Sequence, residues 1–413
     1  MVNNTKRNKS LYRLSLLSVL VASGAVDANQ TFSPAAIPLD NGINITPTIS
    51  VALKNDDNVT FQTEDEIASL VTVINPAVNA VLDDGVNVYS FNYSGVSGTY
   101  ADSEDDNYFD HNVGLSANLG LSAYTALDLA AGYTGGHEPR GTGNSEGNAD
   151  AISEPTLYSN MSLSANYSYG LKESNGRIEL SGLINDKAYD ESLSVTNGVI
   201  TDLTEGKDFT SSKFGGAFYF QTGAGGELFI EVSDSLIRYE DSGSSRDSDD
   251  ARALVGIKWE ATALTSGSFK VGIQNKAFET DARDDFSGLA WEGNIQYQPF
   301  TFSTFTLTTS SAAKDPSVVG DYIEDAVYSA SWMYNFSDAV DASLSYSLNT
   351  EDYVGGSADG RADETSMFSA NLDYAFRSNV LVTGSLSNME RTSTTAGIGF
   401  TQNVVGINVT VGM

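Results

Sequence analysis

The chain of 413 residues contains no cysteine, only two histidines and only 8 prolines. Without cysteine there is no disulfide framework, no thiolate metal site and no cysteine nucleophile. Two histidines leave little material for acid/base chemistry. We therefore expect no metal, no other cofactor and no enzymatic activity.

Positive charge is also scarce, because 22 Lys and Arg residues stand against 54 Asp and Glu residues, giving a formal net charge of −32. A chain this acidic repels phosphate backbones, which excludes nucleic acid as an expected partner. The abundant residues are instead glycine, tyrosine and phenylalanine, with 38, 20 and 19 copies. This composition favours a protein rich in β-strands.

The N-terminus has the organisation of a secretory signal peptide over residues 1–28. Lys6, Arg7, Lys9 and Arg13 precede an apolar stretch over 14–22, and a small-residue cleavage site ends at Ala28. An amphipathic first helix or a membrane anchor is the alternative, but the apolar stretch is far shorter than the ~20 residues that span a bilayer. Residues 29–42 are expected to form a short periplasmic lead.

Period-two alternation dominates the rest of the sequence. At the C-terminus Val405, Ile407, Val409, Val411 and Met413 alternate with polar or small residues, as in a strand with one apolar face. Similar runs predict about eighteen strands, with sixteen as an alternative. Their expected ranges are 43–54, 69–82, 86–99, 109–122, 126–135, 156–170, 176–188, 210–221, 227–239, 251–263, 268–279, 288–298, 301–311, 322–336, 339–351, 365–377, 380–391 and 396–413.

The connections between these strands alternate between short turns and longer polar loops, such as 136–155 and 189–209. Aromatic residues, for example Tyr334 and Phe336, occupy the apolar phase beside the short turns. Both features are typical of outer-membrane barrels with interfacial aromatic girdles. We predict an all-β, transmembrane, antiparallel up-and-down β-barrel over 43–413 in the outer membrane of a Gram-negative bacterium. A soluble β protein with aromatic core residues is the alternative.

Several short segments resemble the β-barrel porins associated with exopolysaccharide and capsule biosynthesis. They are 45–50, 56–59, 107–111, 131–133 with 137–141, and 400–413. The resemblance implies an outer-membrane barrel that serves polysaccharide export. The chain ends on Met413 instead of the usual aromatic residue, which weakens the signal that the last strand offers to the barrel assembly machinery.

The polar phase of the strands is expected to line the lumen. It consists mostly of Ser, Asn, Thr, Gly and Gln, through which a hydrated sugar chain could slide, although such residues also simply suit a water-filled interior. The candidate lumen-facing charges are Asp128, Arg177, Glu179, Lys258, Glu260, Lys270, Lys276, Glu292, Asp341 and Asp373.

The sequence contains few other residues arranged for metal binding or acid/base chemistry. The acidic run from Asp102 to Asp106 lacks the spacing of a calcium loop. Asp110 and His111 are adjacent on one strand and so point to opposite faces. His137 is expected to be a solvated loop residue.

Export of an exopolysaccharide or capsular polysaccharide is the leading hypothesis for function. A general or sugar-selective diffusion porin is the alternative, which inward-folded loops carrying facing arginine and acidic clusters would favour. A surface adhesin or barrel enzyme is a third class. Expected partners are outer-membrane lipid and lipopolysaccharide, the polysaccharide cargo, and periplasmic or inner-membrane export components, since the chain has no nucleotide motif.

Most of the excess negative charge lies in the predicted external loops, for example at Asp247, Asp249 and Asp250. Four roles are open for this charge. The carboxylates could bind divalent cations that bridge to lipopolysaccharide, favour cations in conduction, repel an acidic polymer so that it moves outward, or only keep the surface solvated. If the barrel conducts, we expect modest cation selectivity, because a negative mouth concentrates cations. The reversal potential in a potassium chloride gradient measures this preference, and an anionic preference would contradict it.

Overall fold

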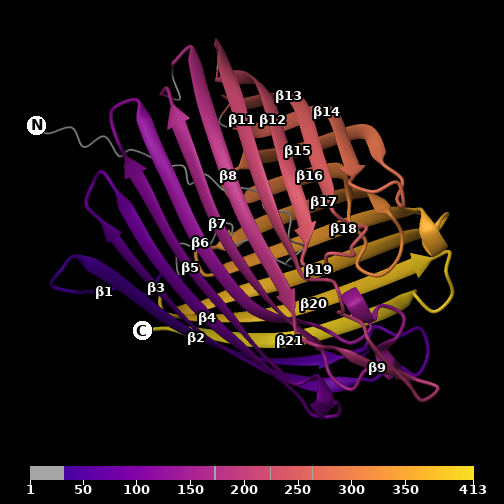
Figure 1. The fold of residues 1–413 in the computed structure, drawn as a ribbon. Coiled ribbons are helices and arrows are strands. Elements are labelled where there is room, and N and C mark those ends of the chain that lie inside the picture. Colours follow the sequence, from indigo (N-terminus) through magenta and orange to yellow (C-terminus); the bar gives the residue numbers. More distant parts are fainter. Residues whose placement is uncertain (1–31, 172–173, 224, 263) are drawn as a thin grey trace, which may run out of the picture.

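The computed structural model describes residues 32–171, 174–223, 225–262 and 264–413. Most of their strands form one antiparallel sheet that closes on itself (Figure 1), and a two-stranded hairpin forms a second, small sheet. The predicted signal peptide lies outside the described residues. Among the described residues, none of the helices has the length and apolar content needed to traverse a bilayer.

Eighteen long strands make up the barrel within the described part of the chain, which confirms the higher of the two predicted counts. They are β2 (Ile43–Asp56), β3 (Ser69–Asp83), β4 (Val88–Tyr100), β5 (Tyr108–Gly120), β6 (Thr125–Glu138), β7 (Thr156–Tyr169), β8 (Gly176–Tyr189), β11 (Phe209–Gly223), β12 (Gly226–Tyr239), β13 (Ser248–Thr262), β14 (Thr265–Phe278), β15 (Phe286–Phe300), β16 (Ser303–Lys314), β17 (Tyr322–Ser337), β18 (Val340–Val354), β19 (Ala362–Arg377), β20 (Val380–Ser393) and β21 (Phe400–Gly412).

Closure occurs between the first and last long strands. β21 pairs with β2 from Thr48 opposite Gly412 to Asp56 opposite Val404, and Figure 1 shows these indigo and yellow strands side by side. Every long strand therefore has a hydrogen-bonded neighbour on both sides. A strand edge left open in lipid would expose unpaired amides, so closure is what allows a sheet to span a membrane.

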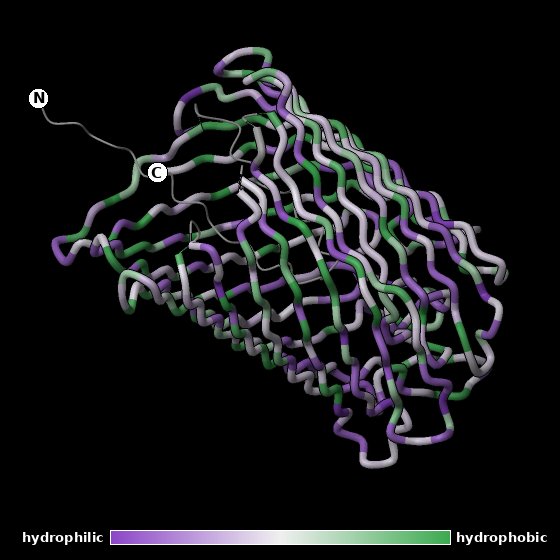
Figure 2. The backbone as a smooth tube through the Cα atoms, turned by 90° about the horizontal axis from the view of Figure 1, so that it is seen from above, coloured by the Kyte–Doolittle hydropathy of each residue, from purple (hydrophilic) through white to green (hydrophobic). Residues whose placement is uncertain are grey.

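The two faces of the barrel differ in the way that the alternation predicts. Leu163 and Leu180 are 58% and 54% exposed, while the alternate residues on their strands are mainly polar. Figure 2 shows this alternation of hydrophobic and hydrophilic positions along the strands. Because a membrane barrel exposes its apolar side chains to lipid, the apolar phase is the outer face and the polar phase the inner face.

Several predicted boundaries were wrong near the external loops. β16 continues to Lys314 and β19 starts at Ala362, whereas residues 312–314 and 362–364 were assigned to loops. The last strand begins at Phe400, not at 396. Backbone pairing extends β16 and β19 past the ends of their apolar alternation, whereas it starts β21 later than the sequence predicts.

The segment before the barrel packs against its closing strands. β1 (Ile37–Pro38) pairs with β2, and the Ser33 amide donates to the Ser378 carbonyl at 2.6 Å. The amide of Met413 donates to the Pro47 carbonyl at 3.2 Å. These contacts hold both described ends of the chain at the side of the short turns. The roles of residues 29–42 as a periplasmic lead and of Val405, Ile407, Val409, Val411 and Met413 as an assembly signal stay predictions.

The assignment of the two faces can be tested by placing one charge on each. Leu163→Arg puts a guanidinium into the lipid near the middle of β7 and should lower the free energy of unfolding by about 2–4 kcal/mol. Ser164→Arg, its neighbour on the inner face, should cost much less because water solvates the charge. Urea unfolding in liposomes measures both, and equal losses would contradict the assignment.

Candidate functional site

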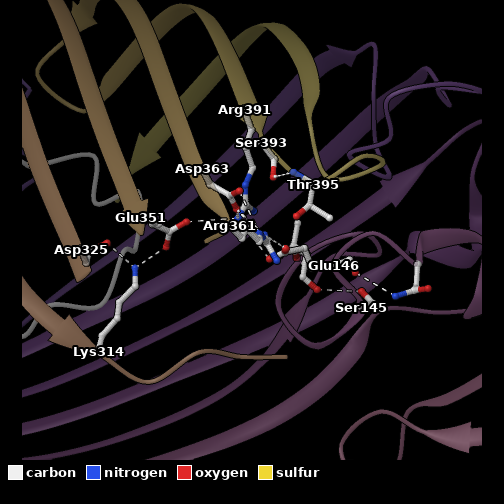
Figure 3. Close-up of polar contacts among 12 residues, drawn as sticks. Ser145, Glu146, Lys314, Asp325, Glu351, Arg361, Asp363, Arg391, Ser393 and Thr395 are labelled. Atoms are coloured by element: carbon white, nitrogen blue, oxygen red, sulfur yellow. Dashed lines mark hydrogen bonds and ion pairs between the residues drawn. The ribbon is translucent and has the colours of Figure 1, made fainter. Parts of the chain in front are cut away.

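A long loop folds away from its own strands and reaches a distant part of the wall. This loop, residues 139–155, connects β6 to β7. Its Glu146 forms ion pairs with Arg361, which directly precedes β19, and with Arg391 on β20. Because β5, β4, β3, β2 and β21 lie between β6 and β20 in the sheet, the loop reaches past the external ends of these five strands, and Figure 3 shows its Glu146 beside Arg361.

Local contacts fix the shape of the crossing loop. Gly141 has a φ of 83° and lies so close to the Thr60 carbonyl that a Cβ there would sit 2.0 Å from its oxygen. The Gly141 amide donates to Ser145 Oγ at 3.0 Å, and the Asn144 amide donates to Glu138 at 3.0 Å. Only glycine tolerates both the conformation and the close approach. The loop is thus held from its base to Glu146.

The wall opposite the loop carries alternating positive and negative side chains on β16 to β20. Together with Glu146 they form the constriction cluster, which consists of Glu146, Lys314, Asp325, Glu351, Arg361, Asp363 and Arg391 (Figure 3). Ion pairs join the members in series, from Lys314–Asp325 at 2.6 Å and Lys314–Glu351 at 2.7 Å to Arg391–Glu351 at 3.4 Å, Arg391–Asp363 at 2.6 Å and Arg361–Asp363 at 2.5 Å.

Burial differs along this cluster. The side chain of Asp363 is fully buried between Arg361 and Arg391, whereas Lys314 is 40% exposed. Burial opposes the charge of Arg361, but hydrogen bonds to Asp363 and the nearby charge of Glu146 outweigh it and raise the pKa of this guanidinium. Arg361 and Asp363 therefore form a permanently charged anchor, and breaking a buried pair of this kind is costly.

A second loop also reaches over the mouth. Residues 190–208 connect β8 to β11 and contain the hairpin of β9 (Leu193–Thr196) and β10 (Val199–Asp202). Lys207 Nζ donates to the Ser317 carbonyl in the loop between β16 and β17 at 2.6 Å. The pKa of Lys207 is lowered to about 8, mainly by burial and also by the charges of Arg246 and Arg283, while Glu138 opposes the shift.

The residues predicted to line the lumen lie in separate groups and do not form one site. Arg177 contacts Glu179 at 3.4 Å and Glu227 at 3.5 Å. Lys270 lies 3.1 Å from Glu292, also a predicted residue, and 3.0 Å from Glu231.

The other predicted charges are dispersed. Lys276 is 1% exposed and pairs with Asp315 at 2.9 Å. Asp341 and Asp373 are register partners on β18 and β19, and Asp128 accepts a hydrogen bond from Asn118 at 2.8 Å. Lys258 and Glu260 lie on β13. A common role for these side chains in the lumen stays a prediction.

The sequence did not reveal the constriction cluster. Glu146 and Arg361 are 215 positions apart, and no local pattern joins them. A usable signal was the concentration of charged residues at strand ends next to long loops, as at Lys314, Glu351 and Arg391. Assigning Lys314 and Asp363 to loops concealed their place on the inner wall.

His137 is not a solvated loop residue, contrary to the prediction. It lies on β6, is 11% exposed, and contacts Asp110 at 2.9 Å through Nδ1. Its ring stacks on Tyr108 with the centroids 4.0 Å apart. In the acidic run, Asp106 pairs with Arg140 at 2.6 Å. These contacts join β5, β6 and the start of the crossing loop.

An open polar cavity runs along the inner wall of β2 to β7. Its volume is about 460 Å³, and its lining includes Asn79, Asn92, Asn112, Thr134 and Ser162. Amide and hydroxyl groups at such a surface suit water and hydrated solutes. Amide and hydroxyl side chains thus border the space inside the barrel along these strands.

Residues 43–413 match the family described as "Putative beta-barrel porin 2". The chain belongs to this porin family. Together with the closed sheet, this makes it an outer-membrane β-barrel porin of a Gram-negative bacterium. The predicted family resemblance and localisation are thereby confirmed, while the association with polysaccharide biosynthesis is not shown.

Solved outer-membrane proteins are similar to this porin at low identity. OpdO of Pseudomonas aeruginosa is 11% identical, with a TM-score of 0.46 over 90% of this chain and 97% of OpdO. OpdK of the same organism is 9% identical, with a TM-score of 0.49 over 89% and 99%. The siderophore receptor PirA of Acinetobacter baumannii is 9% identical, with a TM-score of 0.48 over 89% and 80%. No curated protein matches the chain.

The position of Lys207 predicts that ion selectivity depends on pH. Raising the pH from 7 to 9 deprotonates an ammonium with a pKa of about 8, so the mouth loses a positive charge and cation preference should rise. Reversal potentials across this range measure the step. The variant Lys207→Gln should show the high-pH selectivity throughout, and an unchanged step in that variant would contradict the assignment to Lys207.

Proposed function

We propose that this porin is a non-enzymatic diffusion channel for small hydrophilic solutes, and that the crossing loop 139–155 sets its size limit. The observation that carries the proposal is the ion pairing of Glu146 with Arg361 and Arg391 on the distant wall. A loop fixed across a polar lumen narrows the passage and leaves an aqueous route beside it.

The charges of the constriction cluster favour solutes without a large net charge. Arg361, Arg391 and Lys314 supply three cations, and Glu146, Glu351, Asp325 and Asp363 supply four carboxylates. Because opposite charges alternate within hydrogen-bonding distance, their fields largely cancel at a distance. Neutral or zwitterionic solutes would meet a strongly polar but weakly selective surface.

This arrangement favours the diffusion porin over the export of polysaccharide as a function. A loop folded inward with facing arginine and acidic clusters is the feature that the sequence analysis expects of a diffusion porin. The crossing loop has this feature. A polymer exporter needs a continuous wide path, which loop 139–155 and its buried anchor would obstruct. A diffusion porin would still be expected to contact lipopolysaccharide and the barrel assembly machinery. It would not need the inner-membrane export components.

Single-channel conductance in planar bilayers tests the proposal. Glu146→Ala removes the carboxylate that binds the loop to Arg361 and Arg391, so the loop should leave the passage and conductance should rise by roughly twofold or more. Arg361 and Arg391 keep Asp363 as their partner, so the wall should stay folded.

Glu154→Ala is the matched control, because Glu154 is an exposed carboxylate in the same loop. It changes the charge equally and should leave conductance close to that of the wild type. A wild-type protein that folds but does not conduct would overturn the diffusion channel. An equal effect of both substitutions would show that charge, and not the position of the loop, controls the current.

A further inference from the structure

Aromatic side chains interrupt the polar inner face near the external ends of neighbouring strands. We call this group the aromatic shelf, and it consists of Tyr108, Tyr158, Tyr189, Phe209 and Tyr239. Tyr158 is the register partner of Tyr189, Lys187 of Phe209, and Phe209 of Tyr239. Partners in a register lie on the same face of a sheet, and Lys187 is also partnered by the polar Asn160. The shelf therefore lies on the inner face.

Glycines let two of these rings lie flat against the wall. A Cβ on Gly98 would be 2.1 Å from the ring of Tyr108, and one on Gly136 would be 2.9 Å from the ring of Tyr158. Both rings therefore cover glycine positions on the neighbouring strand. The Tyr158 ring in this orientation turns its other face toward the lumen, where it can stack on a solute. The other face of the Tyr108 ring is already covered, because it stacks on His137 with the centroids 4.0 Å apart.

Charged groups sit among the rings. Lys187 Nζ is 4.4 Å from the centroids of both Tyr158 and Tyr189, and the two ring centroids are 6.2 Å apart. Glu138 accepts hydrogen bonds from Lys187 Nζ at 3.3 Å and from the Tyr189 hydroxyl at 3.1 Å. Stacking surfaces and hydrogen-bonding groups thus occur within one patch.

This combination selects one class of solute. A cation is disfavoured because the Lys187 ammonium, which lies over both rings, repels it, and an anion is disfavoured because Glu138 neutralises Lys187. A purely aromatic compound could stack on the rings but offers no hydroxyl to the polar groups among them. A saccharide offers an apolar ring face for stacking together with hydroxyls that can accept from the Lys187 ammonium.

We propose that the aromatic shelf binds a saccharide by ring stacking before the solute passes the crossing loop. The proposal rests on the proposed diffusion channel and names its solute class. The shelf adjoins the loop directly, because Glu138 ends β6 and accepts from the Asn144 amide within loop 139–155. A solute bound there would be positioned at the entrance to the constriction cluster.

Blocking of ion current by added sugar tests this proposal. Maltotriose and the corresponding trisaccharides of galactose and mannose are titrated onto single channels, and the half-blocking concentration is measured. At least one should block the wild type. Tyr158→Ala and Tyr189→Ala should each raise the half-blocking concentration by roughly five- to tenfold, since each removes one stacking surface.

Two further variants make the result specific. Tyr158→Phe keeps the ring and the stacking face, so block should be retained. Tyr133→Ala removes a tyrosine that is 41% exposed on the outer face, so it should leave block unchanged. Heat-modifiable mobility on gels shows whether each variant is folded.

The outcomes separate this proposal from the one on which it rests. Ion current without block by any of the three sugars, or block that the Tyr158→Ala and Tyr189→Ala variants leave unchanged, would overturn the saccharide site while the diffusion channel stands. A folded wild type without ion current would overturn the diffusion channel itself.

Discussion

Backbone hydrogen bonding in a medium without water is the constraint on which the rest of this structure depends. Lipid offers no partner for a free amide or carbonyl, so a sheet can cross the membrane only when its last strand pairs with its first. The pairing of β2 with β21 meets this condition. In a closed sheet one face meets lipid and the other meets water. This difference produces the alternation of apolar and polar residues along the strands of the sequence.

Closure also decides where charge can be placed. The outer face is covered by hydrocarbon, so most ionisable groups lie in the lumen, the turns and the external loops. Asp186 on β8 and Asp234 on β12 are exceptions, because their register partners Met161 and Phe214 are on the outer face. Many of the charges in the lumen occur as ion pairs or chains, because a solitary charge beside a low-dielectric wall is costly, although Asp341 and Asp373 are neighbours of like charge. The constriction cluster is the longest such chain described here, and it provides the anchor to which Glu146 ties the crossing loop.

The fold was predictable from the sequence because it rests on local periodicity. Val405 to Met413 or Leu163 and its neighbours reveal the strand type without any knowledge of distant residues. The functional geometry was not predictable, because Glu146 meets Arg361 only through the path of a loop with no periodic signal. His137 illustrates the same limit, since its glycine-rich context suggested a loop although backbone pairing extends β6 through Glu138.

The central claim is that a small solute, and not a polymer, passes this barrel. Swelling of liposomes that contain the purified protein tests it most directly, with sugars of increasing size as the osmotic solutes. The structure predicts rapid entry of monosaccharides, slower entry of oligosaccharides and exclusion of large dextrans. Entry of dextran at a rate similar to that of glucose, or no entry of any sugar, would contradict it.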